Sequence, residues 1–153
     1  MNPGAKRYFL EAGDVTPEQG WWLLRWCRSH GATEFTLDLL DDQHTEAAFA
    51  LLNPLWRGLA VRDHIHNGPT REVNLFELSD SGVAALQTLL PFGLFSWWFE
   101  HLDEAQWVED PVVYRDSERL LAVVSHEGLA ELRVPDDESA ELSAAGLQLR
   151  SVP

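Results

Sequence analysis

The last third of the chain places three strand-like segments so close together that their pairing is nearly fixed. They are PVVYRD (111–116), ERLLAVVS (118–125) and GLAELRV (128–134), and short polar turns separate them. Turns of this length join antiparallel neighbours, because a parallel connection needs a crossover of a dozen or more residues. Hydrophobic and charged residues alternate along parts of these segments. The pattern predicts a β-meander with one face toward solvent.

The clearest helix start lies at Thr16. Its hydroxyl is suited to the N-cap, Pro17 takes the first helical position, and Gln19 takes the capping-box position. We expect the helix to run to His30, because Gly31 is a typical C-terminal stop. These signals together predict one helix over 17–30.

The core face of this helix is predicted from a 100° wheel. Leu23, Trp26, Cys27 and Trp22 share one side, and Trp21 falls on the other. Cys27 is the only cysteine, so no intramolecular disulfide can form and a reducing, cytoplasmic setting is the simplest interpretation. A buried thiol has a raised pKa, so Cys27 is interpreted as an inert core residue.

The remaining segments complete an α+β pattern. Local signals predict a first strand (6–12), a second strand (34–40), a short helix (43–52), a hairpin (59–78), a helix that Asp80 caps and that runs to 90, a strand beginning at LFSWWFEHL (94–102) and a short helix after Pro135. FLEAGD (9–14) aligns with LFELSD (75–80), which suggests a pseudo-repeat of strand-helix-strand. The fold expected for 1–153 is one α+β domain with an antiparallel or mixed sheet, helices mainly on one face, and the C-terminal meander and short helix.

The charge of the chain excludes some classes of partner. Its formal net charge is -14, and residues 100–141 hold thirteen carboxylates against three arginines. Such a field repels nucleic-acid phosphates and anionic membrane surfaces and attracts cationic partners. Residues 81–99 carry no formal charge, but Pro91 and Gly93 divide them into a helix-sized and a strand-sized piece. We therefore expect neither nucleic-acid nor membrane binding.

A metal site is one alternative that the sequence raises. His64 and His66 form a His-x-His pair, and on a strand both side chains point the same way. Two imidazoles can hold a metal ion if a third ligand is supplied by His44, His101, His126 or a carboxylate. This pattern supports the hypothesis of a small metal-dependent enzyme. No phosphate-binding glycine loop or catalytic triad signature accompanies it, and no cofactor is predicted.

The strongest surface feature is FSWWFEHLDEAQWVED (95–110), which has five aromatic residues, five carboxylates and no Lys or Arg. Aromatic side chains supply much of the binding energy at protein interfaces, and acidic groups speed the approach of a basic protein. The predicted partner-binding residues are Trp98, Glu100, Asp103, Glu104, Trp107, Glu109 and Asp110.

The leading hypothesis is a non-catalytic acidic module that binds a basic protein. In size, acidity and lack of catalytic motifs the chain is similar to bacterial immunity proteins, which act in the cytosol. That resemblance implies an inhibitor that covers the active site of a basic toxin or enzyme. A further alternative is a dimeric accessory or regulatory domain that associates through an apolar patch containing Trp21 or Trp98. The sequence leaves the oligomeric state open.

Overall fold

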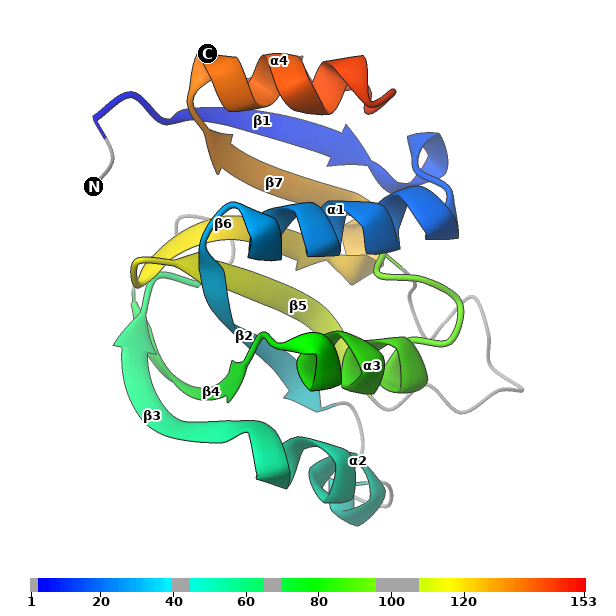
Figure 1. Ribbon diagram of the computed structural model, residues 1–153, viewed down its shortest axis with the longest axis vertical. Helices are drawn as coiled ribbons and strands as arrows, with labels where there is room; N and C mark the ends of the chain where they lie inside the picture. Colours follow the sequence, from blue (N-terminus) through cyan, green and yellow to red (C-terminus); the bar gives the residue numbers. More distant parts are fainter. Residues whose placement is uncertain (1–2, 40–44, 65–69, 96–107) are drawn as a thin grey trace.

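The strands form one antiparallel sheet (Figure 1). The structure is a computed structural model that describes residues 3–39, 45–64, 70–95 and 108–153. Within these ranges the strand order is β3-β4-β2-β5-β6-β7-β1-β8. The strands are β1 (Lys6–Glu11), β2 (Ala32–Leu39), β3 (Trp56–Arg62), β4 (Arg71–Glu77), β5 (Val108–Arg115), β6 (Glu118–Val124), β7 (Leu129–Val134) and β8 (Arg150–Ser151). The predicted α+β class is confirmed, and every pairing is antiparallel.

The helices gather on one face of this sheet, as predicted (Figure 1). They are α1 (Pro17–Ser29), α2 (Thr45–Leu52), α3 (Asp80–Leu89) and α4 (Asp136–Ala144). Leucine and other apolar side chains from all four helices join one core cluster with Phe35, Leu121 and Leu132 of the sheet. Burial of this shared apolar surface is the main favourable contribution to the fold.

Helix α1 begins and ends where its sequence signals lie. The Thr16 hydroxyl accepts a hydrogen bond from the Gln19 backbone N–H, and the Gln19 side chain accepts one from the Thr16 N–H, which completes the capping box. Gly31 follows with a φ of 94°, in the left-handed region that favours glycine. The predicted core face was wrong at one position, because Trp22 is exposed whereas Trp21 packs against the core.

The C-terminal meander is confirmed, but the face predicted to meet solvent is partly buried. Strands β5, β6 and β7 pair in sequence order. The centre of the sheet is covered on both faces, because Val112, Tyr114 and Ala122 form a second apolar cluster on the side away from the helices. The Tyr114 hydroxyl donates to the backbone carbonyl oxygen of Asp63 at 3.1 Å. The residues after β3 therefore fold back over this second cluster.

The expected strand at 94–102 falls mostly on residues outside the described part of the chain. Its first two residues, Leu94 and Phe95, lie in a turn and pack against the helix-side core. The pseudo-repeat is therefore described only as far as α3, since its closing strand would lie in the same segment. Helix α3 is capped by the Ser79 hydroxyl, which accepts from the Gly82 N–H, rather than by Asp80 as predicted.

No helix in the described ranges combines the length and apolar character that crossing a membrane requires.

Candidate functional site

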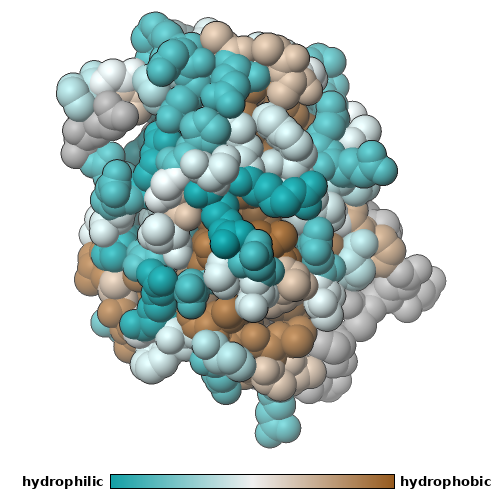
Figure 2. Space-filling view, in the orientation of Figure 1, coloured by the Kyte–Doolittle hydropathy of each residue, from teal (hydrophilic) through white to brown (hydrophobic). Residues whose placement is uncertain are grey.

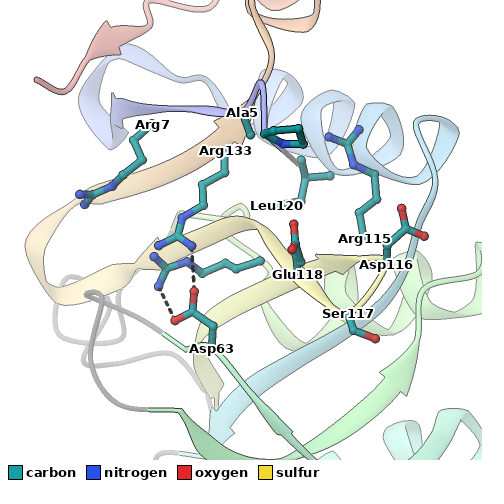
Figure 3. A pocket seen from close by; sticks show the side chains of 11 residues that line it. Ala5, Arg7, Asp63, Arg115, Asp116, Ser117, Glu118, Leu120 and Arg133 are labelled. Carbon is teal, nitrogen blue, oxygen red and sulfur yellow. Dashed lines mark hydrogen bonds and ion pairs between the residues drawn. The ribbon is translucent and has the colours of Figure 1, made fainter. Parts of the chain in front are cut away.

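A buried carboxylate organises the face of the sheet that lies away from the helices. Glu131 on β7 accepts hydrogen bonds from three guanidinium groups: Arg119 Nη2 at 2.7 Å, Arg7 Nη2 at 2.8 Å and Arg133 Nε at 2.9 Å. Arg133 Nη1 also donates to Asp63 Oδ2 at 2.8 Å. Figure 3 shows the Arg133 side chain pointing to Asp63, and Arg119 Nη1 lies 3.9 Å from Asp63 Oδ1. We call these five residues the Glu131 network.

The pairing of β1 with β7 brings two arginines together, and Glu131 offsets their charges. Arg7 and Arg133 stand directly opposite each other in the β1–β7 ladder, where like charges are destabilising. Glu131, two residues before Arg133, lies on the same face and bonds to both. Burial by itself would raise the pKa of Glu131, but the hydrogen bonds and charges of Arg7, Arg119 and Arg133 outweigh it and lower that pKa. The carboxylate is therefore held ionised.

A cavity of about 810 Å³ opens beside this network (Figure 3). Its lining includes Arg7, Arg119 and Arg133 together with acidic residues of the β5–β6 turn. Arg115 also borders it, and both Nη atoms of that side chain bond to Glu138 at 2.7 and 3.0 Å. Among the described lining residues there is neither histidine nor cysteine. The polar groups of the described lining are thus mainly charged side chains, with the Ser117 hydroxyl among them.

Most of the predicted acidic binding surface lies outside the described residues. Trp98, Glu100, Asp103, Glu104 and Trp107 lie outside the described residues. Glu109 and Asp110 are described, and both belong to β5.

Asp110 is committed to the fold. It is buried, and its Oδ1 accepts a hydrogen bond from the Ser125 backbone N–H at 2.7 Å while its own N–H donates to the Ser125 hydroxyl at 3.1 Å. Its φ of 52° is left-handed, a conformation that Asp and Asn tolerate better than most residues. Burial raises the pKa of this carboxyl, although the Ser125 hydrogen bonds oppose the shift. Asp110 therefore joins β5 to the turn after β6.

Glu109 is the more accessible member of the pair. Burial raises the pKa of its carboxyl, and the negative charges of Asp110 and Asp38 raise it further. Glu109 Oε2 has no hydrogen-bond partner among the described residues. A cation brought to this end of the sheet would relieve the mutual repulsion of the three carboxylates.

The role of Asp110 can be tested with two substitutions. Asp110→Ala should lower the free energy of unfolding by about 2–4 kcal/mol, because it leaves a buried N–H of Ser125 without its acceptor and puts alanine in a left-handed conformation. Asp110→Asn keeps an acceptor oxygen and should be as stable as the wild type, or more so, at pH 7. Urea denaturation measures both.

The pH dependence of the Asp110→Asn variant gives a further check. The folded pKa of Asp110 is raised, so its ionised form opposes folding, and this cost is present above the folded pKa. The stability of Asp110→Asn relative to the wild type should therefore be largest at neutral pH. This difference in unfolding free energy should disappear as the pH falls through the raised pKa of Asp110 toward its ordinary value. An advantage that grows in acid would contradict the assigned direction.

Of the His-x-His pair, His64 lies in the described part of the chain. His64 is buried after β3, and its Nε2 lies 2.9 Å from Arg71 Nη2, which itself bonds to Asp38. Burial lowers the pKa of His64, and the Arg71 charge lowers it further. Because a guanidinium only donates, it engages the nitrogen lone pair that a metal would need. His66 lies outside the described residues, and the described residues contain no metal-binding group of three or more His, Cys, Asp or Glu.

The thiol of Cys27 and the hydroxyl of Ser125 both have structural roles. Cys27 is fully buried, as predicted, and burial raises the pKa of its thiol to about 12. Ser125 is buried in its contact with Asp110, while the neighbouring His126 and Glu127 are exposed. Neither group has the activated, accessible environment that nucleophilic catalysis requires.

Sequence reasoning missed the Glu131 network, although one signal was present. Glu131 and Arg133 occupy alternate positions of a strand whose other face is fully apolar, so they lie together on the second face. Their partners come from β1, β6 and the end of β3, which only the tertiary fold brings close. Comparisons of the chain with protein-family models, curated proteins and solved structures find no match.

Proposed function

We propose that this chain is a non-catalytic binding module that presents an acidic surface to a basic protein partner, in the manner of a bacterial immunity protein or inhibitor. One observation carries the proposal. Ten of the eleven basic side chains are ion-paired with carboxylates inside the molecule. The basic residues are thus used internally, and the net charge of -14 is left to the other acidic side chains. A partner that neutralises this surface must bring its own cations.

The proposed surface is the acidic, aromatic segment that ends at Glu109. Its members are Trp98, Glu100, Asp103, Glu104, Trp107 and Glu109, with Asp110 as the structural anchor that fixes the start of β5. The half-buried carboxylate of Glu109, raised in pKa beside Asp38 and Asp110, supports this location. An arriving Arg or Lys gains more from such a crowded group than from an isolated surface carboxylate.

Two charge-matched variants test the proposal. The first combines Asp103→Asn, Glu104→Gln and Glu109→Gln within the proposed surface. The second combines Glu18→Gln, Glu46→Gln and Asp137→Asn, which are exposed positions on three different helices. Each variant removes three negative charges, so any difference between them reports the location of the charge. Wild-type and variant proteins are immobilised, captured proteins are identified by mass spectrometry, and binding kinetics are measured with the partner found.

We expect the wild type to retain a basic protein whose association rate falls at least about tenfold between low and physiological salt. The first variant should bind about tenfold or more weakly than the second. Equal loss in both variants would show that net charge rather than this surface drives binding. An association rate that does not respond to salt would remove the electrostatic basis of the proposal.

A further inference from the structure

β3 forms one edge of the sheet in the described part of the chain. β3 stands at one end of the strand order and pairs with β4, while β8 at the other end has only two residues. In the described part of the chain no strand pairs with the outer side of β3. Its outward backbone N–H and C=O groups are therefore available to an added strand.

This edge is also apolar. Trp56, Leu59 and Val61 are 53%, 58% and 61% exposed, and we call them the β3 strip. They lie toward the helix side of the sheet. Trp56 pairs with the core residue Phe76, and after a β-bulge before Gly58 the strip continues with Leu59 opposite Asn74 and Val61 opposite Glu72, which alternate with Phe76 along β4. Figure 2 shows hydrophobic surface in the lower half of the molecule, where α2, α3 and β3 lie. Natural edge strands usually carry lysine, proline or inward-pointing charges as protection, and 59–61 contains none of these.

The charges near the edge are balanced, unlike those of the chain as a whole. Arg57 lies 3.6 Å from Glu77 and 3.9 Å from Glu34, and Arg62 lies 3.6 Å from Glu34. Two arginines are thus offset by two glutamates at the outer end of the sheet. Elsewhere two copies of a chain with a net charge of -14 would repel each other. At the β3 edge that repulsion is weaker, because the two arginines offset two of the glutamates and leave Glu72, opposite Val61 in the β3–β4 ladder, as a further exposed carboxylate. A strongly basic partner would meet the two arginines there.

We infer that β3 pairs antiparallel with β3 of a second copy of this chain, about a two-fold axis at Ala60, to form one continuous sheet. This register places Leu59 opposite Val61 of the second copy, twice by symmetry. The interface uses main-chain hydrogen bonds for affinity and the β3 strip for apolar contact. This inference is independent of the proposed binding of a basic protein.

The test measures the mass of the full chain in solution by light scattering and sedimentation equilibrium over a wide concentration range. The wild type should be a dimer that dissociates on dilution. Val61→Lys puts two like charges beside the two-fold axis and should raise the dissociation constant at least about tenfold. Because Val61 is exposed, circular dichroism and the melting temperature of the variant monomer should match those of the wild-type monomer. Trp22→Lys, at an exposed tryptophan on α1, is the control and should leave the dimer intact.

A wild type that is monomeric at all concentrations, or a Val61→Lys variant that dimerises as tightly as the wild type, would overturn the inference. Salt separates it from the proposed function, since an apolar strand pairing should persist in high salt whereas binding of a basic partner should weaken. A monomer that captures a basic protein contradicts the dimer alone. A dimer that captures none contradicts the proposed function alone.

Discussion

Glu131→Gln should be among the most damaging single substitutions in this protein, with an expected loss of about 3–5 kcal/mol in the free energy of unfolding. The carboxylate accepts from Arg7, Arg119 and Arg133, and the Arg119 side chain is only 1% exposed. Glutamine keeps the shape but not the charge, so three guanidinium groups would face one another with Asp63 as the remaining carboxylate of the network. Chemical denaturation with a far-ultraviolet circular dichroism readout measures the loss.

A paired substitution distinguishes charge imbalance from lost packing. Glu131→Leu combined with Arg119→Met removes one charge of each sign and should be clearly more stable than Glu131→Gln, because buried ion pairs can be replaced by apolar groups at little cost. The single variants Glu131→Leu and Arg119→Met are measured as well. If the loss of unfolding free energy in the double variant equals the sum of the losses in these two, the residues do not interact and the network as described is wrong.

The same network should set part of the acid sensitivity of the fold. The folded pKa of Glu131 is lowered, so its stabilising contribution is present above its ordinary pKa and is lost as the pH falls through the folded pKa. The difference in stability between the wild type and Glu131→Gln should therefore narrow in strong acid. A difference that stays constant to low pH would show that the carboxylate is not held ionised by the three arginines.

Gly82→Ala should also destabilise the protein strongly, by about 3 kcal/mol, which is the upper end of the usual range for overpacking. Gly82 lies in the first turn of α3, and an added Cβ would sit 2.3 Å from the backbone oxygen of Glu77 and 3.3 Å from the Phe35 ring. A backbone oxygen at the end of β4 cannot move without disturbing the sheet. Helix α3 would have to shift as a unit, and thermal unfolding should report the loss.

Gly20→Ala on α1 is the matched control. Its Cβ would lie 3.4 Å from Leu94 and Phe95 side-chain atoms, which is ordinary contact, and alanine gains about 1 kcal/mol of helix propensity over glycine. Together the contact and the helix propensity should leave the free energy of unfolding of Gly20→Ala within about 1 kcal/mol of the wild-type value. Equal losses at both positions would mean that the close approach of α3 to β4 is not the cause.

The elements that sequence predicted best depend on local contacts. The capping box at Thr16 and Gln19, the stop at Gly31 and the short turns of the meander act within a few residues, so their signals are complete in the sequence. The wheel for α1 predicted Leu23, Trp26 and Cys27 as buried but exchanged the roles of Trp21 and Trp22. A wheel gives relative angles only, whereas neighbouring elements decide how far burial extends around the helix.

The candidate site was predicted less well for the same reason. Asp110 was predicted as a partner-binding residue together with Glu109, but it is buried because the pairing of β5 with β6 brings Ser125 to its carboxylate. The Glu131 network joins residues from positions 7 to 133, and no short sequence window contains them. The partner-binding role of the acidic segment stays a prediction.

By itself, the sequence determined the α+β class, most strand and helix positions, and the excess negative charge, since these follow from local conformational preference, hydrophobic pattern and composition. Only the tertiary structure decided which charges are neutralised within the molecule and which strand ends the sheet of the described residues. Both depend on strand order, which brings distant residues together through cooperative burial of the core and is not encoded in any local pattern.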